Sequence, residues 1–409
     1  MFFKSVVAAV SAMACLSAAV PVNSGAAPQV IKGSYIIKLK DNAPTASHLS
    51  WVSNIHARSA GKDEFAGVEK EYTSDAFHGY AGHFDKDTID KIQNSPEVDY
   101  VEEDQIWYLD DVLEKRALTT QTPSTWGLAG VSHRQPGATG YIYDTTAGEG
   151  TFAYVIDSGI RTTHQEFEGR AIKGYTAFPG DEGDSIGHGT HVAGTVGGKT
   201  FGVAKKATLI SVKVFQSGGA ATSTILGGFD WAVNDIISKS RQDKAALNLS
   251  LGGPRSQIWN DAIKSAFAKG VVSVVAAGNS KVDASGFSPA SAPEAITVGA
   301  VNSRWEIATG WGLTGQAGSN FGTVLDVFAP GDRVESASNA DDTSSVLKNG
   351  TSMATPHVCG LVLYAISVDG VRGPQALTNH IINNSGKGVV KGAIGGSPNR
   401  MANNANTLQ

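Results

Sequence analysis

Six short apolar segments alternate with segments of helical spacing from about residue 150 onward, and they constrain the fold more than any other feature. The apolar segments are FAYVIDSG, ATLISVKVF, AALNLSLGG, VVSVVAAGN, AITVGAV and VLDVFAPG. The helical candidates include HVAGTVGG, ILGGFDWAVNDIISKS and IWNDAIKSAFAKG. Apolar strands that lack polar alternation are buried on both faces, which is typical of a parallel sheet covered by helices. The sequence therefore predicts an α/β domain with a mostly parallel sheet between helices.

A second, smaller domain is predicted over residues 34–110. SYIIKLK, HGYAGHF and VDYVEED have the composition of three strands, and HLSWVSNIHARSA and KDTIDKIQNSP have helical spacing. This mixture within about 75 residues indicates a compact α+β unit. The following segment, LDDVLEKRALTTQTPSTWG, predicts an exposed linker. Its pair Lys115–Arg116 is either a processing site or an ordinary solvated charge pair.

The N-terminal segment MFFKSVVAAVSAMACLSAAV has one lysine, an apolar stretch and then small residues. This pattern predicts a secretory signal peptide over residues 1–19, with a buried N-terminal helix as the alternative. Secretion follows from the signal peptide. Cys15 would leave with it, so the mature chain would hold only Cys359 and no internal disulfide.

Composition and charge exclude several classes of protein. The net charge of −5 provides no basic surface for nucleic acid. No run of 18 or more apolar residues follows the N-terminus, so no membrane span is expected in the mature protein. The 48 glycines have no three-residue period, which excludes collagen. No pattern indicates an obligate oligomer, so a monomer is expected.

Three glycine-framed motifs hold the residue types of nucleophilic catalysis. VIDSG places Asp157 at the end of an apolar strand, and GHGTHVAGTVGG places His188 at the start of a helix. NGTSMATPH places Ser352 at the start of another helix. A serine hydroxyl needs a histidine to accept its proton and a carboxylate to orient that histidine. The sequence therefore predicts a Ser–His–Asp hydrolase, which needs no cofactor for its chemistry.

The start of a helix is a suitable place for the nucleophile because free N–H groups and the positive end of the helix dipole lie there. The N–H of Ser352 is one predicted donor to an oxyanion, and the amide of Asn279, at the end of VVAAGN, is the second. Pro356 is expected in the first turn, where no backbone donor is needed.

The motifs DSG, HGTHVAG and GTSMATPHV, in this order, resemble those of the subtilisin family of serine proteases. SLGG, VVAAGN and SPASAP resemble the proteinase K-like branch, which includes secreted fungal enzymes. The resemblance extends from about Trp126 to near Asn404. It implies a three-layer subtilisin-like fold, a triad of Asp157, His188 and Ser352, and an oxyanion hole with Asn279. It also implies an endopeptidase that acts on proteins.

The resemblance further implies a substrate pocket and a maturation route. Ser250, Leu251 and Gly252 would form one wall of a roomy pocket for apolar or aromatic side chains, and Ala276, Ala277 and Gly278 would form the other. Residues 34–110 resemble, more weakly, the inhibitory propeptide of the family. The implied domains are a signal peptide (1–19), a propeptide (20–116) that inhibits its own enzyme, and a peptidase domain (117–409).

Two further expectations concern a calcium ion and a glycan. Relatives of this branch bind calcium through an aspartate and two backbone carbonyls, and the matching positions are Asp326, Pro293 and Ala295. Capping of a strand end is the alternative role of Asp326. Of three Asn-x-Ser/Thr sequons, Asn248 and Asn349 lie within active-site motifs, where burial is expected to exclude a glycan. Asn383 is the remaining acceptor.

One segment departs from the family pattern. WEIATGWGLTGQAGSN, from Trp305 to Asn320, replaces a shorter segment. It is either a longer surface loop or an error in the gene model. Two other residues have a plain and a functional interpretation. His191 is expected to pack in the interior, not to ligate zinc. Cys359 is expected to be a small buried group, with a reactive thiol as the alternative.

Two other functions remain open. A secreted binding protein on an inactive protease scaffold is the first alternative, and an esterase is the second. The esterase is disfavoured because that class has Gly-x-Ser-x-Gly after a strand and orders its triad Ser, Asp, His.

Overall fold

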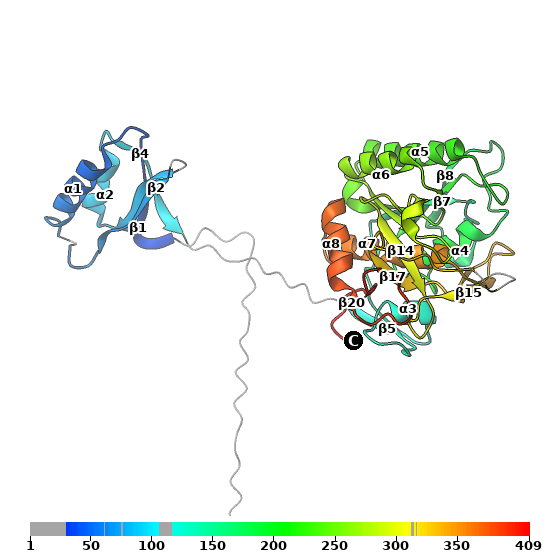
Figure 1. Ribbon diagram of the computed structural model, residues 1–409. Helices are drawn as coiled ribbons and strands as arrows, with labels where there is room; N and C mark the ends of the chain where they lie inside the picture. Colours follow the sequence, from blue (N-terminus) through cyan, green and yellow to red (C-terminus); the bar gives the residue numbers. More distant parts are fainter. Residues whose placement is uncertain (1–29, 61, 75–76, 106–116, 312–314, 316) are drawn as a thin grey trace, which may run out of the picture. The chain divides into compact units, whose positions relative to one another are not determined.

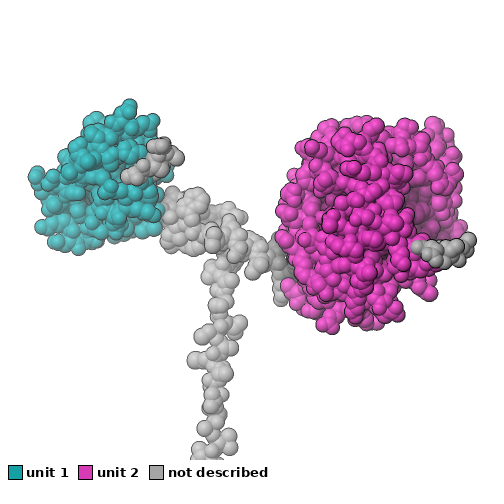
Figure 2. All heavy atoms as spheres, in the orientation of Figure 1, with its two compact units in different colours: residues 1–113 teal, residues 114–409 magenta. Residues whose placement is uncertain are grey.

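The computed structural model describes residues 30–60, 62–74, 77–105, 117–311, 315 and 317–409. The chain divides into two compact units, residues 1–113 and 114–409, which Figure 2 colours separately. The predictions of a signal peptide and of a processing site at Lys115–Arg116 lie outside the described residues. No helix in the described ranges combines the length and the apolar character needed to cross a bilayer.

The first unit is an antiparallel sheet with two helices. Its strands have the order β2-β3-β1-β4, with bounds β1 Val30–Leu39, β2 Gly67–Ser74, β3 Phe77–His83 and β4 Val98–Gln105. The helices are α1 (Thr45–His56) and α2 (Lys86–Gln93). Ile37, Tyr80 and Ile92 are fully buried between sheet and helices. The sequence predicted only three strands, because the edge strand β2 is mostly exposed and rich in charged residues.

The second unit is built on a nine-stranded sheet with the order β20-β21-β17-β14-β12-β10-β7-β9-β8. The β20–β21 pair is antiparallel, and every other pair of neighbours is parallel. The strands are β7 Phe152–Asp157, β8 Ala171–Thr176, β9 Thr208–Lys213, β10 Ala245–Leu249, β12 Val272–Ala276, β14 Ile296–Val301, β17 Val327–Pro330, β20 Gly386–Lys387 and β21 Arg400–Met401. All six apolar segments of the sequence thus form strands of one sheet.

Helices cover both faces of this sheet, as the apolar strands require. Ala153 and Val155 of β7 face a core that includes α4 (His188–Gly197) and α7 (Thr351–Ser367). Tyr154 and Ile156, which alternate with them, face a second core with α5 (Thr222–Ser238) and α6 (Gln257–Ala268). Figure 1 shows α5 and α6 above the sheet, on the side opposite α7 and α4. The predicted three-layer α/β fold is confirmed.

Short elements complete the unit. They are β5 Leu118–Gln121, β6 Tyr141–Asp144, β11 Gly253–Pro254, β13 Phe287–Ser288, β15 Thr309–Trp311, β16 Ala317–Gly318, β18 Val334–Ala337, β19 Ser345–Lys348, α3 Trp126–Gly130, α8 Pro374–Asn384 and three single 3₁₀ turns at Gln165–Phe167, Gln242–Lys244 and Ala284–Gly286. The predicted linker is wrong from residue 118 onward. Its strand β5 pairs with β6, and the Thr125 hydroxyl accepts the Leu128 N–H at the start of α3.

The segment from Trp305 to Asn320 is packed against the domain and is not a surface loop at either end. Trp305 is 1% exposed and lies in a core with Val301 and Phe328. Trp311 is 7% exposed, and Asn320 is fully buried. Both tryptophans therefore contribute to the interior. Residues 312–314 and 316 lie outside the described residues.

The parallel register brings the candidate residues to one edge of the sheet. Asn248 of β10 is level with Val155 of β7 and with Val274 of β12. Continued by two residues, this register sets Asp157 level with Ser250. The carboxyl ends of β7, β10 and β12 thus meet at one edge, where ligands bind in open α/β sheets.

Candidate active site

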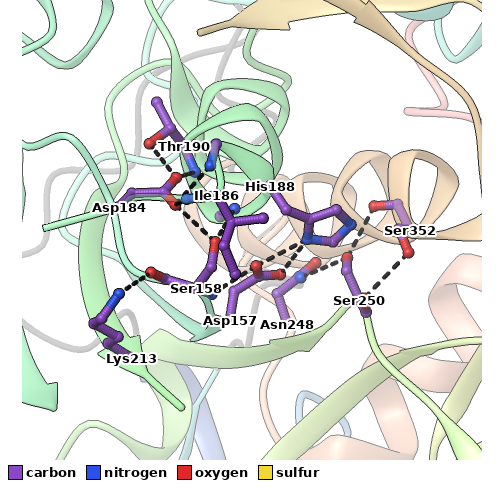
Figure 3. Close-up of polar contacts among 12 residues, drawn as sticks. Asp157, Ser158, Asp184, Ile186, His188, Thr190, Lys213, Asn248, Ser250 and Ser352 are labelled. Carbon is purple, nitrogen blue, oxygen red and sulfur yellow. Dashed lines mark hydrogen bonds and ion pairs between the residues drawn. The ribbon is translucent and has the colours of Figure 1, made fainter. Parts of the chain in front are cut away.

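A carboxylate and an imidazole are joined at this edge. Asp157 ends β7 and is 2% exposed, and His188 is the first residue of α4. The Nδ1–H of His188 donates to the Asp157 carboxylate, with Nδ1 2.8 Å from Oδ1 and 2.9 Å from Oδ2. In Figure 3 the imidazole ring lies between the Asp157 carboxylate and the Ser352 side chain. This arrangement leaves Nε2 as the atom that can accept a proton.

Two opposing effects set the proton affinity of His188. Burial lowers the pKa of its imidazole, but the charge of Asp157 and the hydrogen bond to it raise that pKa more. The net pKa of His188 is raised, although the positive charge of Lys348 opposes the increase. The site therefore favours an imidazolium beside Asp157.

Neighbouring groups hold Asp157 in place from behind. The N–H of Ser158 donates to Asp157 Oδ1 at 2.7 Å. The buried ammonium of Lys213 donates to the carbonyl of Ser158 at 2.8 Å (Figure 3). The segment that carries the carboxylate is thus anchored to the end of β9, the neighbouring strand.

Asp184 organises the start of α4, and the sequence analysis did not single it out. Its Oδ1 accepts from the N–H groups of Ile186 (3.1 Å) and Gly187 (2.8 Å) and from the Ser158 hydroxyl (2.8 Å). Its Oδ2 accepts from the N–H and the hydroxyl of Thr190, at 2.8 and 2.6 Å. An aspartate just before a helix is a recognisable capping signal. Its link to Ser158 joins segments 26 residues apart, which no local pattern predicts.

The nucleophile candidate exchanges hydrogen bonds with β10. Ser352 is the second residue of α7, and its hydroxyl donates to the Ser250 carbonyl at 3.1 Å. The Ser250 hydroxyl donates in return to the Ser352 carbonyl at 2.9 Å, and Asn248 Nδ2 donates to the Ser250 hydroxyl at 2.9 Å. The start of α7 is thereby tied to the strand next to β7.

The prediction for Pro356 is wrong, because the helix begins at Thr351 and Pro356 is its sixth residue. In the second turn, the missing N–H of Pro356 leaves the carbonyl four residues earlier, that of Ser352, without its helical donor. The Ser250 hydroxyl supplies the replacement.

The amide of Asn279 is oriented by Thr351. Its Oδ1 accepts from the Thr351 N–H at 2.8 Å and from the Thr351 hydroxyl at 2.9 Å. The amide oxygen is thus occupied, which leaves the Nδ2–H groups for another acceptor. Gly350, the residue before Thr351, has a φ of 143°, a backbone conformation that residues with a Cβ rarely adopt.

Asn320 supports the loop that follows β12, and its role was not predicted, although it is the last residue of the segment that departs from the family pattern. Its Oδ1 accepts from the N–H groups of Ser280 (3.0 Å) and Val282 (3.2 Å). Its Nδ2 donates to the Ala277 carbonyl at 2.9 Å. These contacts hold the backbone on both sides of Asn279.

A pocket of about 190 Å³ opens beside Ser352 and Asn279. Five of the six expected wall residues line it, and none of its described lining residues is charged; the five are Leu251, Gly252, Ala276, Ala277 and Gly278. Phe287 adds an aromatic ring. Ser250 instead lines an adjoining hollow of about 270 Å³, together with Asp157 and His188.

His191 and Cys359 are interior residues. His191 is fully buried, its Nε2–H is 3.0 and 3.1 Å from the carbonyls of Val334 and Val346, and burial lowers its pKa to about 3. Cys359 is fully buried, and burial raises the pKa of its thiol, which disfavours a reactive thiolate. Among the described residues, no group of three or more His, Cys, Asp or Glu is placed to hold a metal.

The sequons differ in exposure. Asn248 is fully buried, and Asn383 is exposed near the end of α8. The expected burial of Asn349 is wrong, because this residue ends an exposed edge and only its Oδ1 is engaged, by the Arg333 N–H at 2.6 Å. Burial begins at the next residue, Gly350.

A carboxylate, an imidazole and a helix-terminal hydroxyl at the carboxyl edge of a parallel sheet define a serine hydrolase of the α/β class. Comparisons with known proteins narrow this class. Residues 148–403 match the model of the subtilase family, and residues 34–110 match that of the peptidase inhibitor I9 family. The chain belongs to the subtilase family and is a subtilisin-like serine endopeptidase.

Relatives and a solved structure agree with this assignment. The chain is 51% identical to alkaline protease 1 of Aspergillus clavatus over 384 residues, which cover 92% of each chain. It is 49% identical to an alkaline proteinase of Hapsidospora chrysogena, with 92% and 93% of the two chains covered. The crystal structure of a cold-adapted subtilisin-like serine proteinase matches with a TM-score of 0.61 and 34% identity, over 70% of this chain and 100% of that one. The predicted family and function are confirmed, and nothing supports an inactive binding protein.

Asp184→Asn tests the capping of α4. All five groups around this carboxylate are donors, so an amide nitrogen would face an N–H or O–H group. We expect a loss of roughly 1.5–3 kcal/mol in the free energy of unfolding, the usual range for hydrogen bonds to a charged group. Denaturant unfolding of the mature enzyme, first inactivated with a fluorophosphonate to prevent self-digestion, measures this free energy. Asp261→Asn on the exposed side of α6 is the control, and equal stabilities of the two variants would contradict the capping role.

Lys348→Gln tests the electrostatics of His188. Because the Lys348 charge lowers the pKa of His188, its removal raises that pKa. Activity requires the neutral imidazole, so we expect the acid limb of the kcat/KM–pH profile to move to higher pH. The displacement should shrink at high ionic strength. Lys264→Gln on α6 is the control. An acid limb that stays in place or moves to lower pH would show that Lys348 does not act on His188.

Proposed function

We propose that Ser352, His188 and Asp157 are the catalytic triad. The Ser352 Oγ attacks the carbonyl carbon of a peptide bond, and its proton passes to His188 Nε2. The same proton is then transferred to the leaving amine as the C–N bond breaks, which leaves an acyl-enzyme. Water, deprotonated by His188, attacks the ester and releases the acid. Asp157 fixes the tautomer of His188 and stabilises the imidazolium.

One observation carries this proposal: Asp157 binds the Nδ1 side of His188 at 2.8–2.9 Å, while the opposite side of the ring faces Ser352 (Figure 3). The Ser352 hydroxyl donates to the Ser250 carbonyl in the free enzyme. Transfer of the hydroxyl proton to His188 requires the Ser352 hydroxyl to turn toward Nε2, and catalytic hydrogen bonds commonly tighten when substrate binds.

Asn279 Nδ2 and the N–H of Ser352 are the proposed oxyanion donors. Thr351 occupies the opposite end of the Asn279 amide, so the donor end is set before substrate arrives. Loss of one such donor typically costs about 10²–10³ in kcat.

The uncharged pocket beside Ser352 supports broad specificity that favours an apolar or aromatic side chain before the scissile bond. We assign Leu251–Gly252 and Ala276–Gly278 as its walls. We propose that Ser250 positions Ser352 instead, because two hydrogen bonds join these two residues. The substrates are proteins, whose extended backbone would pair with these walls.

We propose the maturation route that the sequence predicted: a signal peptide (1–19), a propeptide (20–116), and a secreted, monomeric peptidase (117–409). The match of residues 34–110 to the inhibitor I9 family supports an intramolecular inhibitor. The separate core of the first unit supports its folding as a domain. Asn383, exposed on α8, is the proposed glycan acceptor.

Ser352→Ala tests the triad and the maturation route together. We expect it to abolish hydrolysis and to leave the propeptide attached, because cleavage needs the nucleophile. Intact mass before and after treatment with a fluorophosphonate measures both. The wild-type product should begin near Ala117 and gain one adduct at Ser352. Normal maturation of the Ser352→Ala variant would overturn the assignment.

A structural calcium ion is a second proposal. Asp326 directly precedes β17, Ala295 directly precedes β14, its parallel neighbour, and Pro293 lies two residues before Ala295. The carboxylate and the two carbonyls therefore lie at the same end of adjacent strands. Asp326 Oδ2 accepts from the Thr297 N–H at 2.8 Å, and burial raises the pKa of Asp326 to about 6. A hard cation beside this carboxylate would offset its desolvation, and oxygen donors suit calcium.

Calcium removal should therefore destabilise the mature domain. Calcium at about 100 times its Kd would add about 2.7 kcal/mol to the free energy of unfolding. Without calcium, the raised pKa of Asp326 makes stability fall as pH rises from 3.8 to about 6. Thermal unfolding of the fluorophosphonate-inactivated enzyme, with calcium and with a chelator and over a range of pH, measures the calcium dependence and the pH dependence of stability. Asp326→Asn should remove the calcium dependence, and a variant that keeps it in full would refute the site.

A further inference from the structure

The segment that departs from the family pattern contacts the oxyanion loop directly. Its strands β15 and β16 form an antiparallel hairpin, with Thr309 paired to Gly318. The Gly318 N–H donates to the Asn279 carbonyl at 3.1 Å, and the Lys281 N–H donates to the Gly318 carbonyl at 3.0 Å. Strand β16 thus holds the backbone of the residue whose side chain is the proposed oxyanion donor.

The other strand of the hairpin contacts the loop after β17. The buried indole of Trp311 donates from Nε1 to Asp332 Oδ1 at 2.8 Å. The residue before Asp332, Gly331, accepts the Gly350 N–H at 2.8 Å through its carbonyl. Gly350 is the N-cap of α7, two residues before Ser352. The hairpin is therefore linked to the nucleophile through one side chain and one loop.

These contacts close a ring. From Asn279 it runs through Gly318 to Trp311, then through Asp332 and Gly331 to Gly350, and the Thr351 N–H returns to Asn279 Oδ1 at 2.8 Å. The two proposed oxyanion donors, Asn279 Nδ2 and the Ser352 N–H, belong to residues of this ring or next to it. An oxyanion hole depends on donors held in place before the reaction, and displacements near 1 Å are costly.

We propose that the hairpin of β15 and β16 is a positioning element of the oxyanion hole, and that Trp311 acts through its hydrogen bond to Asp332. Trp311 is not a catalytic residue, because it acts through the loop of Gly331 and Asp332, which accepts the Gly350 N–H at the start of α7. The inference rests on the proposed role of Asn279. It assigns a function to the segment that the family pattern does not explain.

Trp311→Phe is the first test, because it keeps a buried aromatic ring and removes the N–H donor. We expect kcat on a peptide amide to fall roughly tenfold with KM within about twofold, since the effect is on the transition state. The acid limb of the pH profile should not move, because Asp157 and His188 are untouched. Active-site titration with a fluorophosphonate normalises each rate to the mature, folded enzyme.

A double-mutant cycle separates positioning from general damage. In the Asn279→Ala background only the Ser352 N–H remains to be positioned, so Trp311→Phe should there cost about threefold or less, clearly below its tenfold effect in the wild type. Asp332→Asn keeps the Oδ1 acceptor and should retain most activity, whereas Asp332→Ala should resemble Trp311→Phe. This pair also serves if Trp311→Phe fails to mature. Trp231→Phe is the matched control. Trp231 packs against Tyr175 beside the core that contains α5 and α6, away from the ring of contacts described above.

The outcomes are distinguishable. A tenfold loss that shrinks to about threefold or less in the Asn279→Ala background supports the proposal. A loss of the same factor in both backgrounds overturns it, as does a kcat for Trp311→Phe and Asp332→Ala within twofold of wild type. If Asn279→Ala alone leaves kcat unchanged, the proposed oxyanion role of Asn279 fails instead, whatever Trp311 does.

Discussion

The parallel pairing of β7, β10 and β12 is the constraint on which the rest of the site depends. Parallel neighbours end at the same edge, so residues far apart in sequence meet there without any further device. This register sets the positions of Asp157, Ser250 and the loop that carries Asn279. A shift of one residue in β7 would turn Asp157 to the other face of the sheet and place Tyr154 in the wrong core. The two apolar cores therefore specify the position of the carboxylate that we propose as the triad aspartate.

The helices supply the other half of the site, and they meet the sheet through hydrogen bonds to backbone groups. Asp184 satisfies N–H groups at the start of α4, and the Ser250 hydroxyl satisfies the carbonyl that Pro356 leaves open in α7. Each device meets a local requirement of the helix and also joins the start of that helix to the residues that follow β7 or β10. The hydrogen bonds that satisfy the helix ends therefore also help to set the positions of the proposed catalytic residues.

Much of this could be predicted from the sequence, and the failures have physical causes. The six apolar runs predicted six strands, because burial on both faces leaves an unambiguous pattern. The strands β2 and β8 were missed because edge strands are partly exposed and carry polar residues. Asp157, His188, Ser352 and Asn279 stand at strand or helix ends that the sequence marks with glycine.

The supporting residues could not be found in this way. Thr351 contacts Asn279 across 72 residues, and Asn320 reaches Ala277 across 43. Trp311, which lies in the segment that departs from the family pattern, is joined to Asp332 across 21 residues. Such contacts depend on how the loops fold back to the edge of the sheet. The spacing of residues within a short motif does not predict the path of those loops. Sequence motifs therefore suffice to propose the reacting groups, whereas the precision with which those groups are held depends on contacts that only the folded chain reveals.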